Sequence, residues 1–444
     1  MNNLSTSKHS RMPNRWLSMP WGTFLFILTV FVFATPVRIF RFGLSMGSIE
    51  ATDAISMTTD LLGRDNLERQ MALILLGAFA LISLVRRRTW LRFQNNGMLG
   101  WFILFYLIWA VLSIMWSIDT RFTLKRVAIL VLLSLGALSV ADRFSLRQTI
   151  ALVFFINAIF LLSSIIIVFS NNYFHPFTST WRFTGNVHPI VQGWQCGLLI
   201  LASLALSKTT ENKRAVYYGI ALIAFLFLWL TRSRGPIVGL MLGSAVYVGL
   251  TASMRYKVAL FLGIVIFGCL LVFLPENVLN TLGESVITAG RGGEGLESME
   301  TLSNRLPLWK ACLSAANESP LLGYGYNSFF APQNIEPFAR KVGWTAATPH
   351  SGYIGAALGL GYPGAFALVL FLFLSIKMSV RLALRDSNYA FVAAVLVWLC
   401  VCLYSEEDLL TRPSFQCFTW MILLAKLGFY RKTEQEIHDG RPSD

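Results

Sequence analysis

The 444-residue sequence has few charged residues and no cysteine pattern typical of a disulfide framework. Only 14% of its residues are charged and 55% are hydrophobic, which excludes an ordinary soluble globular protein. Most of the cysteines lie inside apolar runs, so they predict neither a disulfide nor a metal site. No small-residue cleavage site follows the first apolar run, which argues against a cleaved signal peptide.

The formal net charge of +14 does not come with the pattern of a nucleic-acid groove. Such a groove needs a basic run interleaved with aromatic residues over a polar surface, and no segment of this sequence has one. Cytoplasmic loops of membrane proteins are also rich in lysine and arginine. The charge therefore predicts membrane orientation, and nucleic acid is not an expected partner.

Apolar runs recur along nearly the whole chain. A spanning helix needs about 20 mostly apolar residues. The runs that approach this length lie near residues 17–36, 70–85, 98–117, 124–141, 148–170, 189–206, 215–231, 235–254, 257–275, 351–376, 388–405 and 414–430. There is no internal repeat or low-complexity segment. The sequence therefore predicts an all-α polytopic membrane protein with about twelve transmembrane helices, forming a single membrane domain over residues 1–444.

Basic clusters in alternate connectors orient the predicted helices. With the N-terminal tail in the cytoplasm, one side of the membrane receives the clusters near residues 86–88, 143–147, 213–214, 255–257, 381–385 and 431–432. The positive-inside rule requires this arrangement. Both termini are then cytoplasmic. Residues 276–350 become one large periplasmic loop between the ninth and tenth helices, with short helices of its own.

Several arginines stand out because this orientation places them on the outer face. They are Arg182, Arg232, Arg234, Arg305 and Arg340. The first three have no acidic residue near them in the sequence. A single interfacial arginine often snorkels toward water, and that alternative stays open for each one. As a group, arginines without local acidic partners favour an anionic ligand or the interior of the bundle.

Predicted helix starts lie beside these arginines. The runs near residues 189, 235 and 351 each have a proline within two residues of their start, where a first helical turn tolerates it. Asn304 is the expected cap of an amphipathic helix that has Arg305 in its first turn. Helix N-termini bind anions, and arginine forks match phosphate oxygens. We therefore expect a bulky, lipid-borne diphosphate as ligand.

The outward loops contain no cluster of acidic residues and histidines with metal-ligand spacing. The nearest approach to one is Glu406-Glu407-Asp408, three consecutive residues at a helix end, which we interpret as a solvated terminus. The expected diphosphate site therefore uses no metal and no cofactor.

His350 directly precedes the run that begins near residue 351. A lone histidine often has a structural role, but a helix N-terminus favours the neutral imidazole, which can accept a proton. His350 would take the proton from an attacking sugar hydroxyl, while Arg305 and the other arginines stabilise the departing diphosphate. These roles predict direct, inverting displacement. The candidate sugar contacts are Trp309, Tyr324, Tyr353 and His188.

Five motifs occur in order within residues 98–376. They are Arg182-Phe-Thr-Gly-Asn-Val-His-Pro, Thr231-Arg-Ser-Arg-Gly, Asn304-Arg-Leu-Pro-Leu-Trp, Pro320-Leu-Leu-Gly-Tyr-Gly and Pro349-His-Ser-Gly-Tyr-Ile. With the large loop before the tenth helix, this order resembles the O-antigen ligase and polysaccharide polymerase superfamily of bacterial inner-membrane proteins. Ile190 and Ser351 stand where members of that superfamily often carry asparagine.

The resemblance implies a metal-independent glycosyltransferase of the inner membrane whose active site faces the periplasm. The donor would be a glycan on undecaprenyl diphosphate. The acceptor would be lipid A core, another lipid-linked repeat or a protein hydroxyl, and the spacing before His350 slightly favours the exopolysaccharide-polymerase branch. The resemblance assigns His350 to acceptor activation and Arg182, Arg234 and Arg305 to the donor diphosphate, with Arg232 as a weaker candidate.

Two other classes of protein stay open at this point. One is a twelve-span transporter or flippase of lipid-linked oligosaccharide, and the other is a scaffold for polysaccharide export. A transporter should place charged residues near the bilayer midplane and show related halves, whereas these runs carry few charges at their centres. A scaffold would leave the outward arginines without a role.

Overall fold

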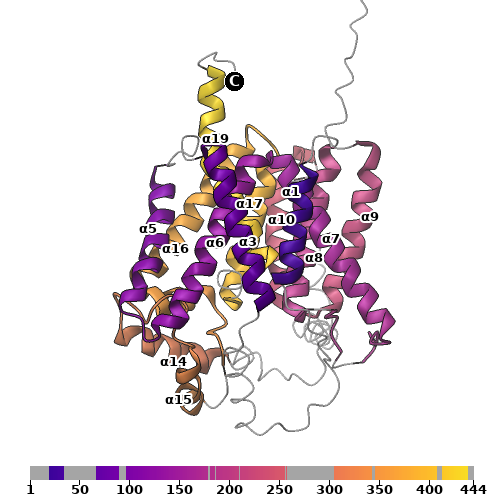
Figure 1. Cartoon of the computed structure of the whole chain (residues 1–444). Helices are drawn as coiled ribbons and strands as arrows, with labels where there is room; N and C mark the ends of the chain where they lie inside the picture. The colour runs from indigo at the N-terminus through magenta and orange to yellow at the C-terminus, as the bar shows by residue number, and fades with distance from the viewer. Residues whose placement is uncertain are drawn as a thin grey trace, which may run out of the picture.

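The computed structural model describes residues 20–34, 67–89, 97–178, 181–185, 187–209, 211–255, 257, 305–342, 346–407 and 413–438. All regular secondary structure within these ranges is helical, which confirms the predicted all-α class. The apolar helices form one bundle, and two shorter helices lie beneath one end of it (Figure 1).

The bundle contains α1 (Trp21–Ala34), α3 (Leu67–Arg86), α5 (Met98–Leu112), α6 (Thr120–Arg143), α7 (Leu146–Ser170), α8 (Pro189–Thr209), α9 (Arg214–Leu230), α10 (Arg234–Thr251), α16 (Gly352–Ala383), α17 (Tyr389–Ser405) and α19 (Phe415–His438). The short turns η2 (Ser113–Met115) and η3 (Glu211–Lys213) are 3₁₀ helices. The two helices beneath the bundle are α14 (Arg305–Glu318) and α15 (Pro332–Val342), and the C-terminal end of α19 projects from the opposite end (Figure 1).

The expected apolar runs coincide with helices, except that the run near 257–275 lies outside the described residues. Within the described part of the chain, seven helices are long and apolar enough to cross a membrane, and α1, α9, α17 and α19 carry shorter apolar stretches. The number twelve and the periplasmic position of the 276–350 loop stay predictions. The described part of that loop contains α14 and α15.

Helix α17 occupies the centre of the bundle. It is apolar on every face, a pattern that favours burial on all sides, and most of its side chains are buried. It packs against α8, α10, α16 and α19. Because α17 is surrounded, the residues that follow its last turn emerge in the middle of one end of the bundle.

Three glycines at four-residue spacing bring α10 close to α17. A Cβ at Gly243 would lie 2.8 Å from a backbone oxygen of α17, and one at Gly239 would lie 3.0 Å from the indole of Trp398. A Cβ at Gly235 would lie 2.8 Å from Ser405 Oγ. Small residues at this spacing are typical of closely packed membrane helices. They hold the start of α10 against the last turn of α17.

Helix α16 is broken in its first half, whereas the sequence predicts one uninterrupted run over 351–376. The break is at Gly361, whose φ of 69° and ψ of −179° are not helical, and Pro363 follows it. A Cβ at this glycine would lie 2.5 Å from the carbonyl oxygen of Leu321, so only glycine fits. The first part of α16 is therefore a separate short helix that begins two residues after His350.

Neighbouring segments satisfy the backbone groups around this break. Tyr324 N donates to Leu358 O at 2.8 Å, Trp109 Nε1 donates to Leu360 O at 3.0 Å, and Tyr362 N donates to Pro320 O at 2.7 Å. Irregular backbone at membrane depth is stable only where protein groups replace the lost helical hydrogen bonds. The Gly-Tyr-Gly turn at 323–325 therefore fixes the short helix in place.

Candidate active site

The end of the bundle that carries α14 and α15 is where the predicted site residues lie. Segment 181–185 is joined to the α9–α10 turn there by the hydrogen bond from Phe183 N to Leu230 O, of 2.9 Å. The start of α14 and the residues before α16 both contact the residues that follow α17. Segments far apart in the sequence therefore meet at the end of α17.

Arg182 is anchored on the α9–α10 turn. Its Nε donates to Thr231 O at 2.9 Å and its Nη2 donates to Ser233 Oγ at 3.0 Å. Thr231 follows the last residue of α9, where exposed helical carbonyls favour a positive charge. The fork of Arg182 is thus oriented by the same turn that supplies the other two arginines of this region.

Arg232 and Arg234 lie on the turn itself. Arg232 adopts a left-handed backbone conformation with φ of 48°, and its Nη2 donates to Pro176 O at 3.3 Å. Arg234 is the first residue of α10, and the next residue, Gly235, abuts Ser405 of α17. The helix start carrying Arg234 is therefore adjacent to the end of α17, where Arg305 also binds.

Arg305 and His350 meet at one carboxylate, that of Glu406. Arg305 is the first residue of α14, and its Nη1 donates to Ser405 O at 2.7 Å while its Nη2 pairs with Glu406 Oε1 at 2.7 Å. The other oxygen, Oε2, lies 3.5 Å from His350 Nδ1. Glu406 thus bridges two residues that are 45 positions apart in the sequence and lie on different segments.

The carboxyl group of Glu406 has a lowered pKa despite its burial. Burial of the carboxyl group favours the protonated form, but the facing His350 and then Arg305 outweigh this effect and lower the pKa of Glu406 below its ordinary value. A negative charge beside Nδ1 favours the tautomer with the proton on Nδ1, so Nε2 is the nitrogen that can accept a proton.

The interpretation of Glu406 and Glu407 as a solvated helix end is wrong. Glu406 is 6% exposed and Glu407 is 4% exposed. The physical reason is the position of α17: a helix buried on all sides delivers the residues after it into the centre of the bundle end rather than into solvent. Asp408 lies outside the described residues.

The backbone around His350 is held in an uncommon conformation. His350 has a φ of 48°, and the preceding Pro349 accepts a hydrogen bond of 2.9 Å from Trp309 Nε1 on α14. Positive φ at a residue other than glycine is a source of strain that persists only where surrounding contacts fix it. Trp309 is buried and supplies one of these contacts, so it ties α14 to the segment that carries the imidazole.

The predicted sugar contacts have defined partners within the protein. The partner of Trp309 is Pro349 O. The hydroxyl of Tyr353 donates to Cys400 O at 2.9 Å, and the hydroxyl of Tyr324 donates to Ala315 O at 2.9 Å. Nδ1 of His188 accepts from Ile190 N at 3.4 Å. Their contact with sugar stays a prediction. Arg340 pairs with Glu336 on the exposed side of α15, which separates it from the arginines near α17.

The arrangement has the parts needed for general-base transfer beside an anion. It combines arginine forks, an imidazole and a carboxylate that can stabilise the imidazole when it is protonated. Among the described residues, no group of three or more His, Cys, Asp and Glu side chains is placed to hold a metal ion.

Comparison with known families decides the relationship. Residues 219–372 match the family model of the O-antigen ligases. The chain therefore carries an O-antigen ligase domain, which supports a relationship to the O-antigen ligase superfamily. The matched region runs from α9 into α16 and contains Arg232, Arg234, Arg305 and His350. It supports the general class of glycosyltransferase-type ligases and polymerases in the membrane. No curated protein matches the chain.

Proposed function

We propose that this protein is an inverting glycosyltransferase that moves a glycan from undecaprenyl diphosphate to a sugar hydroxyl. The acceptor hydroxyl belongs to lipid A core or to another lipid-linked glycan. The reaction takes place at the periplasmic face of the bacterial inner membrane. The observation that carries the proposal is the bridge from Arg305 through Glu406 to His350.

His350 is the proposed general base. Its Nε2 takes the proton of the acceptor hydroxyl while the hydroxyl oxygen forms a bond to the anomeric carbon of the donor. The bond between that carbon and the diphosphate oxygen breaks at the same time, and the leaving lipid diphosphate takes the electron pair. Glu406 faces Nδ1 and stabilises the imidazolium that forms.

Arg305, Arg234 and Arg182 are the proposed diphosphate ligands, with Arg232 as a fourth. Negative charge on the leaving group increases as the bond breaks, so preorganised arginines stabilise the transition state more than the ground state. Arg305 makes two hydrogen bonds to Ser405 and Glu406 and is 21% exposed. A guanidinium has five N–H donors, so Arg305 can keep both contacts and still reach a phosphate oxygen.

The test is a deletion strain complemented with Arg305→Ala or His350→Ala. Lipopolysaccharide and secreted polysaccharide are analysed separately, and membrane levels of each variant are measured. Both variants should lose the glycan product at normal protein level. Loss of capped lipopolysaccharide with intact polymer identifies a ligase, and accumulation of single repeats identifies a polymerase.

Two matched controls come from the same outer face. Arg340→Ala removes an exposed arginine of the same loop, and His175→Ala removes an exposed histidine of the loop after α7. Both controls should make normal glycan. Normal glycan from Arg305→Ala and His350→Ala as well would refute the proposal.

A further inference from the structure

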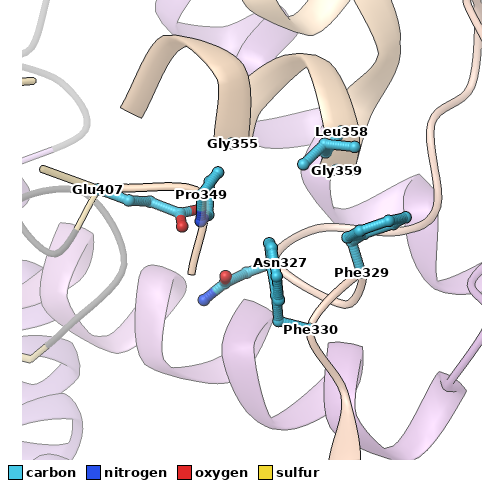
Figure 2. Close-up of a pocket in the computed structure, with 8 residues that line it drawn as sticks. All are labelled: Asn327, Phe329, Phe330, Pro349, Gly355, Leu358, Gly359 and Glu407. Carbon is cyan, nitrogen blue, oxygen red and sulfur yellow. The ribbon is translucent and has the colours of Figure 1, made fainter. Parts of the chain in front are cut away.

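Two adjacent leucines after α14 are exposed although an apolar core lies close to them. Phe329 and Phe330 are buried in that core, across from the first part of α16, which carries Leu358 (Figure 2). Leu321 and Leu322, a few residues earlier, are 68% and 41% exposed. A single exposed leucine is ordinary, but an exposed apolar patch indicates a surface that meets a partner or a membrane.

The turn that carries these leucines is fixed to the helices of the bundle. Pro320 O accepts from Tyr362 N at 2.7 Å, next to the break in α16. Leu322 O accepts from Trp116 Nε1 at 2.8 Å, just after the end of α5 and η2. Both contacts use backbone carbonyl groups of the turn. The exposed leucine side chains therefore belong to a turn whose backbone is held on two sides.

The length of α16 places this turn at the edge of a membrane. Residues 363–383, which follow the break, rise about 32 Å at about 1.5 Å per residue. The hydrocarbon core of a bilayer is about 30 Å thick. When Arg381, in the last turn of α16, lies at one face of that core, Tyr362 lies at the other face. The hydrogen bond between Tyr362 and Pro320 then holds the turn at that level.

An exposed apolar stripe on α5 leads to the same place. Its members recur at three- or four-residue spacing and are Met98, Trp101, Phe105, Ile108, Leu112 and Met115. The stretch that carries them is long and apolar enough to cross a membrane. It packs beside α16 at the edge of the bundle (Figure 1). Because Trp116 follows this stripe and binds Leu322, the lipid-facing surface continues into the leucines of the turn.

The first two turns of α6 add positive charge near this level. Arg121 and Lys125 are exposed there, and they share one face of the helix with the exposed Leu124 and Val131. Lysine and arginine at a membrane boundary lay their stems along apolar groups and direct their charged ends to the headgroup region. Charged groups above apolar ones fit a lipid leaflet.

We propose that the Pro320–Leu322 turn inserts into the outer leaflet of the membrane, where its leucine side chains contact acyl chains while Arg121 and Lys125 face lipid phosphates. The partner is the phospholipid bilayer. A second copy of the chain is disfavoured, because the surface is continuous with membrane-spanning helices and has basic residues at the level of the phosphates.

Insertion of the turn has a consequence for α14. This helix ends at Glu318, directly before the turn, and its first residue is Arg305. Contact between the turn and the lipid therefore holds the end of α14 at the membrane surface. The inference concerns the placement of the protein in the bilayer and does not depend on the proposed reaction.

The test places an environment-sensitive fluorescent amino acid at position 321 of the full-length protein by codon suppression. The protein is reconstituted in nanodiscs of phosphatidylethanolamine and phosphatidylglycerol, with or without bromine on the acyl chains near the headgroup. Bromine quenches a fluorophore inside the bilayer, and iodide in the buffer quenches one in water. Brominated lipid should lower the emission from position 321 about twofold, because the leucines lie at the boundary between headgroups and acyl chains.

Two control positions calibrate this measurement. Position 336 is the aqueous control, because Glu336 is exposed on α15. Position 366 is the membrane control, because Phe366 is exposed on α16 after the break. Gel filtration shows whether each labelled protein is folded and monodisperse. If the label at position 321 prevents folding, the same label at position 322 replaces it.

Position 321 should respond as position 366 does, with strong quenching by bromine and weak quenching by iodide. Iodide quenching as strong as at position 336 would refute insertion, whatever the response to bromine. Protection from both quenchers would also refute it, because a protein surface such as a second copy would then cover the turn. Neither result involves glycan transfer, so the inference and the proposed function can fail separately.

Discussion

Replacing Glu406 with glutamine tests the central contact of the site. Glu406→Gln preserves the size of the side chain and an oxygen that can accept from Arg305, but it removes the negative charge that faces His350. In the proposed transfer, the loss of this charge matters when the imidazole becomes protonated, as the acceptor hydroxyl gives up its proton. We therefore expect kcat to fall while donor KM changes by less than about threefold.

The size of this effect follows from the distance between the two groups. Nδ1 of His350 lies 3.5 Å from Oε2 of Glu406. At that distance two unit charges attract by about 5 kcal/mol at an effective dielectric constant of about 20. Arg305, at 2.7 Å from Oε1, offsets part of the carboxylate charge. If about 3 to 4 kcal/mol remains, kcat should fall roughly 10²- to 10³-fold.

The same change has a stability component that must be measured separately. A glutamine leaves the charge of Arg305 without its ionic partner, and breaking a buried pair destabilises proteins by about 3–5 kcal/mol. Because Arg305 is 21% exposed and keeps its hydrogen bond to Ser405, the loss should be smaller than that range. A thermal unfolding curve in detergent decides whether the variant is folded at the assay temperature.

The assay is transfer from lipid-linked glycan by equal amounts of folded wild type and variant. Glu406→Asp retains the charge at a longer distance from His350, so its kcat should lie between those of the wild type and Glu406→Gln. Glu336→Gln is the control, because it neutralises an exposed glutamate that pairs with Arg340. Wild-type kcat in folded Glu406→Gln would show that the carboxylate does not assist the imidazole.

Three further changes test the support of the site. Trp309→Phe keeps an aromatic, though smaller, ring and removes the N–H that binds Pro349 O. We expect kcat to fall up to about tenfold with unchanged substrate KM values in a transfer assay. Asp119→Ala should destabilise the protein by about 1 kcal/mol, since Asp119 caps α6 by accepting from Phe122 N at 2.8 Å. That hydrogen bond is the main reason why the pKa of Asp119 lies below its ordinary value of 3.8. The difference in Tm between the wild type and Asp119→Ala should therefore reach its full size above pH 3.8 and shrink as the pH falls through the lowered pKa. Gly361→Ala should lower Tm markedly, because it combines a φ of 69° with a Cβ 2.5 Å from a carbonyl oxygen, and a Tm equal to the wild type would contradict the broken-helix geometry.

The sequence predicts the helices well because their signal is local. Each apolar run within the described residues coincides with a helix, and Arg305 lies in the first turn of α14 as expected. The gathering of the outward arginines near one end also follows from a local rule, since the positive-inside pattern sorts connectors by side. These features depend on neighbouring residues only.

The contacts that complete the site have no such local signal. Glu406 pairs with Arg305 across 101 positions, and nothing near either residue identifies the partner. An indirect signal does exist: α17 is apolar on every face, so acidic residues directly after it are expected to be buried and therefore paired. The break at Gly361 is missed for a different reason, because membrane helices tolerate glycine and proline without interruption.

The positive charges of Arg182 and Arg305 are partly compensated by groups of the protein itself. Arg182 is held by the carbonyl end of α9, and Arg305 by the carbonyl end of α17 and by Glu406. In the proposed reaction, an uncompensated cluster would bind the lipid diphosphate product at least as tightly as the donor and so slow its release. Partial compensation lowers ground-state attraction while leaving fixed donors directed at the charge that develops during bond breaking. If the arginines bind the diphosphate as proposed, a site built in this way favours the transition state over both substrate and product.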